Sequence, residues 1–479
     1  MSAAPLWTAA EIAAATGAPL PGGAVWTADG VSIDSRTMAR GDLFVALKGP
    51  NFDGHGFVPG VLAAGAAGAL VDHVPDGVDP ADPRLLRVDD TLAALTRLGR
   101  AGRDRTRARV VAVTGSVGKT GTKELLRLAL EANGSTVASR ASLNNHWGLP
   151  LSLARVPRDV DWVVQEVGMN HAGEIAALAP LARPHVGVIT TVEPVHIEFF
   201  LSVEAIADAK AELFLGMDAD GTAVLNRDNP HFERLARHAR ARGLRRILDF
   251  GAADGTHAHL VAAELAETGS RVEAIVGGRH LRYRLGAPGR HWVQNSLAAL
   301  AAVDALGADV ALAAEALSAI AAPVGRGARR EVPLPGGGAF TLLDESYNAN
   351  PASMRAAFSV LATTAPGPGG RRIAVLGDMR ELGETAPRLH AALAEPLAAA
   401  GVDMVFCCGP LMAHLHASLP AALRGAHVAT SDELAPVVAE AVRTGDVVTV
   451  KGSLGTRMAP IVKRLSAGPW GRAPQAAAL

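Results

Sequence analysis

One segment constrains the fold of this chain more than any other: an apolar run that passes directly into a glycine-rich loop. Val110–Val113 has the composition of a buried strand, and Thr114–Thr120 follows with the sequence TGSVGKT. Leucine and alanine then recur at helical spacing as far as Asn133. A strand, a glycine-rich loop and a helix in this order form a cradle in which backbone N–H groups bind phosphate oxygens. The segment therefore predicts a nucleotide-binding parallel α/β sheet.

Two side chains of the loop carry specific expectations. Lys119 is expected to reach the β- and γ-phosphates, and the Thr120 hydroxyl to bind Mg²⁺. The spacing departs from the usual phosphate loop because Val113 stands where its first glycine would be. A chance glycine-rich turn is the alternative, but the flanking strand and helix favour nucleotide binding. The candidate nucleotide-contacting residues of the loop are Gly115, Ser116, Val117, Gly118, Lys119, Thr120 and Gly121.

The rest of the chain is organised around this segment. Its 479 residues suffice for about three domains, and we expect units at 1–88, 89–323 and 324–479. Expected strands alternate with helices up to the C-terminus, which favours parallel sheets throughout. The helix expected over 89–107 ends in a run of arginines, read most simply as a solvated face.

Charge, cysteines and hydropathy exclude several classes of protein. The chain has 46 basic and 47 acidic residues, so no positive field marks a nucleic-acid binder. Cys407 and Cys408 are adjacent and suit neither a disulfide framework nor a zinc site, as expected in a reducing cytosol. The N-terminus lacks the features of a secretion signal, and the apolar stretch 61–71 is too short to span a bilayer. We expect a soluble cytoplasmic protein.

Two more polar residues are expected near the phosphate loop. Glu166 ends a second strand that begins at Trp162, and His196 lies in the loop after a third strand at 186–189. In a doubly wound sheet, ligands gather at the carboxyl ends of the strands. Each residue alone is more simply a loop residue bonded to the backbone, but the shared edge favours the role of Mg²⁺ ligand.

Lys210 occupies the centre of an apolar stripe on the helix expected over 203–214. Only six of the 46 basic residues are lysines, so a lysine here is unusual. A buried lysine must pair, reach solvent or lose its charge. A neutral amine can take up CO₂ to become a carbamate, which is an anionic metal ligand. From the pattern alone, a salt bridge to a carboxylate is the favoured interpretation.

Several motifs occur in an order that resembles the Mur ligase superfamily, whose members form amide bonds with ATP. They are Thr114–Thr120, Leu143–Pro150 (LNNHWGLP), Glu166–His171 (EVGMNH), Ala207–Glu212 (ADAKAE), Gly289–Asn295 (GRHWVQN) and Gly325-Arg326. The segments DSR, GDLFVALKG and DGHGF within 34–57 resemble its uridine-nucleotide-binding first domain. Asp344–Met354 (DESYNANPASM), Gly377–Gly383 (GDMRELG) and Val450–Ser453 resemble the branch that adds D-alanyl-D-alanine. No Asp-Asn-Pro-Arg stretch, typical of the diaminopimelate-adding branch, occurs. The resemblance covers about residues 31 to 458.

The resemblance implies a three-domain α/β enzyme with a central P-loop-type parallel sheet and a C-terminal Rossmann-like domain. The first domain would hold the UDP end of UDP-MurNAc-tripeptide, the second Mg·ATP, and the third the dipeptide D-Ala-D-Ala. The tripeptide carboxylate would attack the γ-phosphate to give an acyl phosphate, which the dipeptide amine would then attack. A hinge near Arg326 would let the domains close and exclude water. The implied enzyme is a monomer of cytoplasmic peptidoglycan synthesis.

The resemblance also implies roles for individual residues. Thr120 and Glu166 would bind a first Mg²⁺, and His196 with a carbamate on Lys210 a second. Lys119, Lys210, His196 and Glu166 would form the catalytic set, Asn295 would contact adenine, and Arg326 the phosphates. The residues implied to bind substrate are Ser35, Arg36, Lys48, Asn144, Asn145, Tyr347, Asn348 and Asn350. For Asn350, capping of a helix that begins at Pro351 is a sufficient alternative.

Two departures from the family pattern bear on the nucleotide. Gly121 stands where serine or threonine is usual, and Trp292 stands where asparagine is usual. The adenine contact that asparagine would make at position 292 is therefore not predicted, and the Trp292 ring could instead stack on the base. Other functions remain alternatives at this stage. They are a different ligase of the superfamily, such as a diaminopimelate-adding ligase or a folylpolyglutamate synthetase, a P-loop phosphotransferase, and a nucleotide-binding scaffold without turnover.

Overall fold

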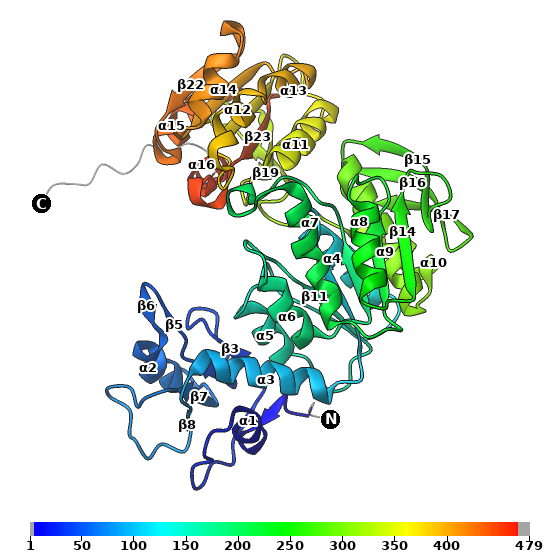
Figure 1. Cartoon of the computed structure of the whole chain (residues 1–479). Coiled ribbons are helices and arrows are strands. Elements are labelled where there is room, and N and C mark those ends of the chain that lie inside the picture. The colour runs from blue at the N-terminus through cyan, green and yellow to red at the C-terminus, as the bar shows by residue number, and fades with distance from the viewer. Residues whose placement is uncertain (1–3, 468–479) are drawn as a thin grey trace, which may run out of the picture.

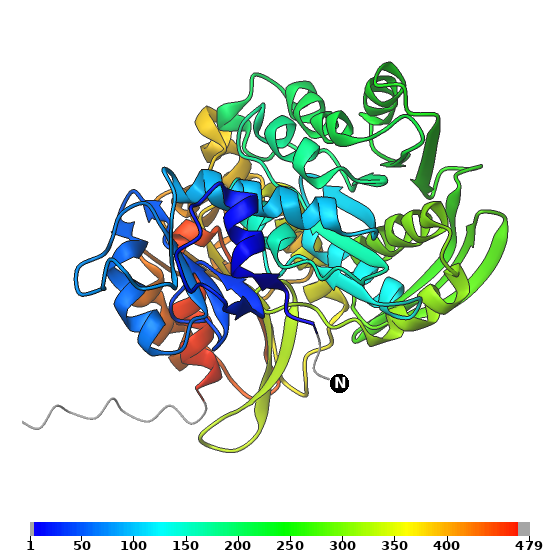
Figure 2. The ribbon, with the colours of Figure 1, turned by 90° about the horizontal axis from the view of Figure 1, so that it is seen from below.

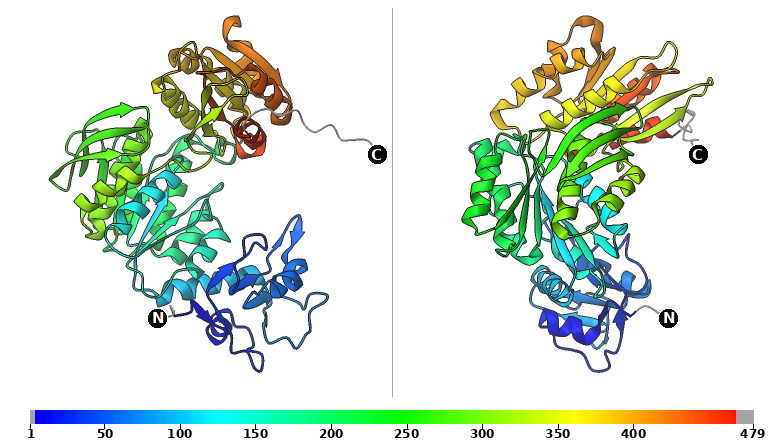
Figure 3. Two further views of the ribbon diagram at one scale, coloured as in Figure 1. Left: turned by 180° about the vertical axis from the view of Figure 1, so that it is seen from behind. Right: turned by 90° about the vertical axis from the view of Figure 1, so that its right-hand side faces the viewer.

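The computed structural model describes residues 4–467, which form three α/β units that follow one another along the chain (Figure 1). Seen from the side, the units form a column with the central unit between the other two (Figure 3). Each unit has its own principal sheet. The three-domain α/β architecture is thereby confirmed, while the boundaries at residues 88 and 323 stay a prediction.

The N-terminal unit is built on four parallel strands in the order β3-β4-β7-β8. Two short antiparallel pairs, β1 with β2 and β5 with β6, flank this sheet. Helices α1 and α3 pack on one face of the sheet and α2 on the other (Figure 2). The elements are β1 (Trp7–Thr8), α1 (Ala9–Thr16), β2 (Thr27–Ala28), β3 (Gly30–Ser32), β4 (Asp42–Val45), β5 (Lys48–Gly49), β6 (Phe52–Asp53), α2 (Val58–Ala63), β7 (Gly68–Val71), β8 (Leu85–Arg87) and α3 (Thr91–Arg105).

Arg103 and Arg105 at the end of α3 do not form a solvated face, so that prediction is wrong for them, although Arg107 after the helix is exposed. Arg103 is only 9% exposed, and its guanidinium donates to the carbonyl of Ala182 in the central unit. Arg105 donates to the carbonyls of Leu6 and Val156. Long side chains that donate to backbone carbonyls leave no sequence signal, because their acceptors lie far away in the chain. They fasten α3 between the first two units.

The central unit is a nine-stranded sheet in the order β10-β11-β9-β12-β13-β14-β15-β16-β17. Helices α4, α9 and α10 cover one face and α5, α6, α7 and α8 the other. The strands are β9 (Arg109–Thr114), β10 (Thr136–Ala138), β11 (Trp162–Glu166), β12 (Val186–Ile189), β13 (Thr222–Asn226), β14 (Arg246–Gly251), β15 (Ala258–Ala266), β16 (Gly269–Val276) and β17 (Arg279–Leu285). The helices are α4 (Lys119–Glu131), α5 (Gly148–Ala154), α6 (Glu174–Ala182), α7 (Val203–Ala211), α8 (Phe232–Ala241), α9 (Arg290–Leu306) and α10 (Val310–Ala316).

Parallel sheets throughout were predicted, and the structure corrects this in all three units, beginning with the antiparallel pairs β1-β2 and β5-β6 of the N-terminal unit. Strands β15, β16 and β17 form an antiparallel meander at the edge of the central sheet. In the C-terminal unit, β18 pairs antiparallel with β19. Strands joined by tight turns pair antiparallel because a parallel neighbour requires a long crossover connection. The Gly277-Gly278 segment between β16 and β17 is such a tight turn.

The C-terminal unit has a six-stranded sheet in the order β18-β19-β23-β20-β21-β22. Helices α11, α12, α13 and α14 pack on one face, and α15 and α16 on the other. The strands are β18 (Ala328–Pro333), β19 (Ala339–Glu345), β20 (Arg372–Gly377), β21 (Met404–Cys408), β22 (Arg424–Val428) and β23 (Val447–Lys451). The helices are α11 (Pro351–Thr363), α12 (Ala386–Ala391), α13 (Ala394–Ala399), α14 (Met412–Ser418), α15 (Ser431–Ala441) and α16 (Ala459–Ser466). Among residues 4–467, no helix combines the length and the apolar character needed to cross a membrane.

Candidate active site

Three strands end side by side at one edge of the central sheet. The parallel register places Glu166, the last residue of β11, beside Val113 of β9, and Ile189, the last residue of β12, beside Thr114. The phosphate loop leaves β9 at this edge, between the segments that follow β11 and β12. The structure therefore brings together the phosphate loop and the two neighbouring loops that the sequence suggested.

Two glycines of the phosphate loop are required by the close approach of other groups. Gly115 has a φ of 147°, and a Cβ at this position would lie 1.9 Å from the Thr190 hydroxyl oxygen. Gly118 has a φ of 85°, and its Cβ would lie 2.6 Å from Oδ1 of Asn295. Helix α4 begins at the next residue, Lys119. The loop thus presents the N-terminus of a 13-residue helix, which attracts anions.

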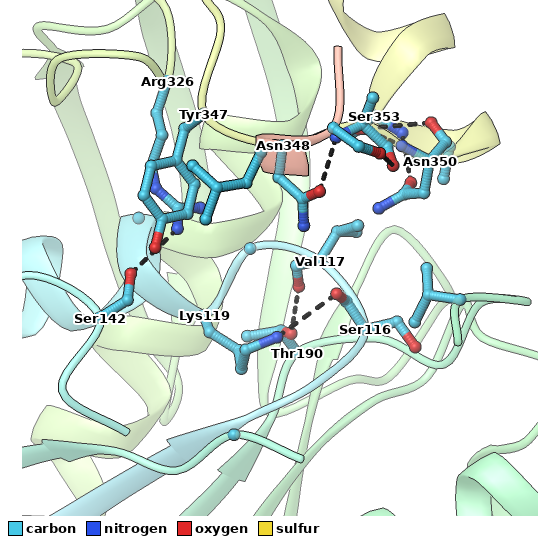
Figure 4. Close-up of a pocket in the computed structure, with 18 of the residues that line it drawn as sticks. Ser116, Val117, Lys119, Ser142, Thr190, Arg326, Tyr347, Asn348, Asn350 and Ser353 are labelled. Carbon is cyan, nitrogen blue, oxygen red and sulfur yellow. Dashed lines mark hydrogen bonds between the residues drawn. The ribbon is translucent and has the colours of Figure 1, made fainter. Parts of the chain in front are cut away.

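The segment after β12 holds the phosphate loop from the side. The Ser116 N–H donates to the Thr191 carbonyl at 2.8 Å, and the Ser116 hydroxyl donates to the Glu193 carbonyl at 3.1 Å. The Thr190 hydroxyl donates to the Val117 carbonyl at 2.6 Å (Figure 4). These bonds fix the loop before any ligand arrives, so little conformational entropy remains to be lost on binding.

Lys119 folds back over its own loop. Its ammonium donates to the carbonyl of Gly115 at 2.7 Å. Burial lowers the pKa of Lys119, the nearby Glu166 carboxylate opposes this shift, and the Arg326 guanidinium adds to it. A compact positive charge therefore lies at the mouth of the cradle, where it can approach phosphate oxygens.

Glu166 is a fully buried carboxylate with neutral partners. The Thr120 hydroxyl donates to one carboxylate oxygen at 2.9 Å, and the Asn144 amide donates to the other at 2.7 Å. Within residues 4–467, no lysine, arginine or histidine forms a salt bridge with this group. A buried carboxylate that forms no salt bridge and lies beside a hydroxyl is a set of hard oxygen donors that fits Mg²⁺. Asn144 also lines the cavity, so its predicted role in binding substrate stays a prediction.

Lys210 is buried on α7 and is 2% exposed. In the described part of the chain its ammonium has neither a hydrogen bond nor a salt bridge, so the carboxylate partner favoured by the sequence pattern is missing. Burial lowers the pKa of Lys210 well below its usual value, and the like charge of Lys119 adds to the shift. Both effects favour the neutral amine, which is the form that reacts with CO₂.

His196 reaches the same edge from the loop after β12. It has a φ of 55° and lines the cavity beside the phosphate loop. Its Nδ1 is hydrogen-bonded to the carboxylate of Glu381 in the C-terminal unit. Burial lowers the pKa of His196, although Glu381 pulls it the other way. Neutral imidazole is the form that binds metal ions.

Helix α9 supplies the wall behind the phosphate loop. Asn295 is 8% exposed, and Trp292 packs in the core of the central unit with 4% exposure. A Cβ on Gly121 would lie 3.1 Å from the Asn295 amide nitrogen and 3.2 Å from the Trp292 ring. Gly121 and Trp292, the two departures from the family pattern, are therefore neighbours. The Trp292 indole lies next to the space that a side chain at position 121 would occupy.

The C-terminal unit forms the facing wall of the cavity. Arg326 donates to the Ser142 hydroxyl at 3.2 Å, and its guanidinium carbon lies 4.1 Å from the centre of the Tyr347 ring (Figure 4). Asn348 accepts the N–H of Ala349 at 2.8 Å. The cavity between the walls has a volume of about 850 Å³, which falls within the range of small-molecule sites.

Asn350 caps α11, as its sequence alternative stated. Its side chain accepts the N–H of Ser353 at 2.9 Å, and the Ser353 hydroxyl accepts the N–H of Asn350 at 3.0 Å. Pro351 occupies the first helical position. Asn350 also lines the cavity, so a ligand contact is compatible with the cap.

Sequence reasoning left four charged residues of this wall out of the site: Glu345, Arg380, Glu381 and Lys451. Lys451 is 3% exposed and donates to the Asn348 carbonyl at 3.0 Å and to Glu345 at 3.4 Å. Glu345 and Glu381 also line the cavity. Each lies in a quoted motif, and Glu345 and Lys451 end neighbouring strands, β19 and β23. The position of Glu345 and Lys451 at the ends of neighbouring strands is the signal by which the sequence could have indicated them.

Of the remaining residues predicted to bind substrate, one lies at the cavity and three lie in the N-terminal unit. Asn145 lines the cavity, and its side chain accepts the N–H of Gly148. Ser35, Arg36 and Lys48 lie in the N-terminal unit and do not line the cavity. Arg36 pairs with Asp34 at 2.7 Å, and Lys48 pairs with Asp72 at 2.9 Å. The structure therefore does not bring these three residues to the phosphate loop.

Comparison with known proteins gives consistent results over nearly the whole chain. Family models match in three places: "Mur ligase family, catalytic domain" at residues 27–103, "Mur ligase middle domain" at 113–303 and "Mur ligase, glutamate ligase domain" at 329–454. The UDP-N-acetylmuramoyl-tripeptide–D-alanyl-D-alanine ligase of Escherichia coli K12 is 35% identical over 445 residues, which cover 92% of this chain and 95% of that protein.

Solved structures agree with the sequence comparison. MurF from Acinetobacter baumannii superimposes with a TM-score of 0.82 at 29% identity, covering 96% of this chain and 99% of that one. MurF ligase from Thermotoga maritima, solved in complex with ADP, superimposes with a TM-score of 0.74 at 28% identity, covering 91% and 97%.

Proposed function

Because this chain belongs to the Mur ligase family, as one of its UDP-N-acetylmuramoyl-tripeptide–D-alanyl-D-alanine ligases, we propose how its residues carry out that ATP-dependent reaction of peptidoglycan synthesis. The observation that carries the proposal is the cavity of about 850 Å³ with two chemically different walls. One wall is the phosphate loop with Glu166 and His196. The other is the C-terminal unit with Arg326 and the segment from Glu345 to Asn350.

The reaction joins the terminal carboxylate of UDP-MurNAc-tripeptide to the amine of D-Ala-D-Ala. A carboxylate oxygen attacks the γ-phosphorus of ATP, and the bond from that phosphorus to ADP breaks, which leaves an acyl phosphate. The dipeptide nitrogen then attacks the acyl carbon and loses a proton, and inorganic phosphate leaves as the C–O bond breaks. Both steps develop negative charge on phosphate oxygens and depend on positioning more than on covalent help.

The phosphate loop is the proposed site of the ATP phosphates. The N–H groups at the start of α4 and the ammonium of Lys119 supply positive charge where the transferred phosphoryl group develops negative charge. To do so, Lys119 must exchange its bond to the Gly115 carbonyl for a bond to phosphate. Asn295 on α9 is proposed to meet the adenine, and Arg326 the phosphates from the facing wall.

Thr120 and Glu166 are the proposed ligands of one Mg²⁺, and His196 with Lys210 those of a second. Bound Mg²⁺ would neutralise phosphate charge and align the γ-phosphate with the attacking carboxylate. The fit rests on the donors themselves: a buried carboxylate with only neutral partners beside a hydroxyl, and an imidazole in its neutral form.

Lys210 is proposed to act as a carbamate. Its Nζ forms a bond to the carbon of CO₂ and releases a proton, which converts a neutral amine into an anion. The support is an amine that is buried, unpaired within residues 4–467 and lowered in pKa. A carbamate would reverse the sign of the group and make it a ligand for a divalent cation.

The two substrates are proposed to enter from opposite units. Ser35, Arg36 and Lys48 of the N-terminal unit would bind the UDP end, while Tyr347 and Asn348 would lie near the dipeptide. The boundaries at 88 and 323 would then separate three substrate sites, and movement near Arg326 would close them against water. We further propose that the protein acts as a monomer in the cytoplasm.

The first test mixes the purified protein with Mg·ATP and UDP-MurNAc-tripeptide and follows phosphate release with and without D-Ala-D-Ala. We expect release that requires both substrates, with a pentapeptide product detected by mass. No release would refute the substrate pair, and a folate with glutamate would be the next pair to test.

A second test addresses Lys210. Lys210→Ala should lose most of the activity and regain part of it when short carboxylic acids are added, because a free carboxylate can occupy the place of the carbamate. Full activity of the variant without additives would refute the carbamate. Lys463→Ala, at an exposed lysine on α16, is the matched control.

A further inference from the structure

We propose that Glu381 of the C-terminal unit is a positioning residue for His196, so that docking of this unit orients a metal ligand of the central unit. The proposal rests on the proposed function of His196 as a metal ligand. Glu381 lies in the segment between β20 and α12, and 185 residues separate it from His196 in the chain.

The carboxylate of Glu381 bonds to Nδ1 of His196. A carboxylate can only accept, so Nδ1 carries the proton of the neutral ring. Nε2 is then the lone-pair nitrogen, and no hydrogen bond occupies it within residues 4–467. Metal-binding histidines commonly donate their other ring N–H to a carboxylate, which fixes both the tautomer and the ring orientation.

The backbone around this contact is held in an uncommon conformation on both sides. His196 has a φ of 55° and Glu381 a φ of 62°, and they are two of the five non-glycine residues of the described chain with positive φ. Such conformations cost free energy and persist where surrounding contacts hold them. That both partners of one interdomain contact adopt them indicates that the geometry of the pair is specified.

Neighbouring contacts support the same docking. The Glu198 N–H donates to the Glu381 carbonyl at 3.3 Å. The Ile197 side chain packs against the cores of both the central and the C-terminal units. A Cβ on Gly383 would lie 3.5 Å from Cα of Glu198. The loop that carries His196 is therefore seated on the C-terminal unit by polar and apolar contacts as well as by the hydrogen bond between His196 and Glu381.

These observations favour positioning over a simple electrostatic latch. A latch between two units needs only opposite charges, and exposed ion pairs contribute little. Here the partner is an imidazole whose Nε2 is left free, within the described residues, to bind a metal ion. The loop around it is also fixed by the Glu198 hydrogen bond and by the packing of Ile197. The C-terminal unit would thus prepare the metal site as well as cover it.

The test measures Mn²⁺ binding to the full chain by electron paramagnetic resonance, in the presence of a non-hydrolysable ATP analogue. We expect Glu381→Ala to weaken the Mn²⁺ site that includes His196 by about 10- to 100-fold, the usual effect of removing such a partner. Glu381→Gln keeps an oxygen acceptor at the same reach and should lose less. Binding of ADP without metal should not change in either variant.

Two control variants make the outcomes distinguishable. His196→Ala should remove the same Mn²⁺ site, and Glu384→Ala, at an exposed acid three residues along, should leave it intact. Unchanged Mn²⁺ affinity in both Glu381 variants, with loss in His196→Ala, would overturn the positioning role and leave the metal assignment standing. Unchanged affinity in His196→Ala as well would overturn the metal assignment and the positioning role together.

Discussion

Replacing Lys210 with methionine should make the folded protein more stable, although it should abolish activity. Lys210 is 2% exposed and unpaired within residues 4–467, and burial and Lys119 both disfavour its charged form. Methionine has a similar length and no charge, so it suits the apolar surroundings. An unpaired polar group costs about 1–3 kcal/mol when buried. We therefore expect Lys210→Met to raise the free energy of unfolding by at least about 1–3 kcal/mol near neutral pH.

The gain should depend on pH with a definite sign. The pKa of Lys210 in the folded chain lies well below its usual value. Between that pKa and the unfolded value of about 10.4, the unfolded chain binds a proton that the folded chain lacks. Folding of the parent therefore becomes more favourable as the pH rises, by up to about 1.4 kcal/mol per pH unit. The advantage of the methionine variant should shrink as the pH approaches 10 and grow as it falls.

The assay is guanidinium unfolding followed by tryptophan fluorescence, in buffers free of CO₂ and divalent cations, between pH 7 and 9.5. Trp162 and Trp292 report on the central unit. Lys463→Met is the matched control and should show no such pH dependence, because Lys463 is exposed. A parent that is more stable than Lys210→Met, or a difference independent of pH, would mean that the ammonium is paired. The reasoning that leads to a carbamate would then fail.

Three further predictions concern the walls of the cavity. Lys119→Ala should lower kcat by about 10²-fold or more because it removes a charge contact to the transferred phosphate; near-normal phosphate release would show that the phosphate loop is misassigned. Asn350→Ala should destabilise the C-terminal unit by about 1 kcal/mol through loss of the cap, whereas Asn350→Ser should not. Thermal unfolding distinguishes the two, and equal melting temperatures would exclude the cap as a source of stability. Gly121→Val should displace Trp292 and weaken ADP binding about tenfold, since overpacking costs about 1–3 kcal/mol. Calorimetric titration that finds unchanged affinity would contradict this.

Local sequence signals were sufficient for the side of the site that lies on the central sheet. The apolar run before TGSVGKT became β9, and the residue that ends β11 is Glu166. Parallel register then brings the strand ends together without further information. The cap at Asn350 was also readable, because an N-cap and a first-turn proline are neighbours in the chain.

Contacts between distant segments could not be read in the same way. The bond of His196 to Glu381, and that of Arg326 to Ser142, join residues more than 180 positions apart. Their formation depends on how two rigid units dock, which no local periodicity encodes. The antiparallel pairing of β15, β16 and β17 was not predicted for a different reason. Its Gly277-Gly278 turn is a recognisable hairpin signal, but the alternation of strands and helices elsewhere masked it.

The two-walled cavity has a consequence for inhibitors. Each wall is held by its own unit, and a compound that engages only one wall leaves the other free to move away. A bridging compound, with an anionic group for the phosphate loop and a second group for the segment around Tyr347, makes the second contact intramolecular and raises its effective concentration. The approach of Arg326 to Ser142 at 3.2 Å shows that the walls meet, so the linker should be short and stiff. Residence time should improve more than the rate of association.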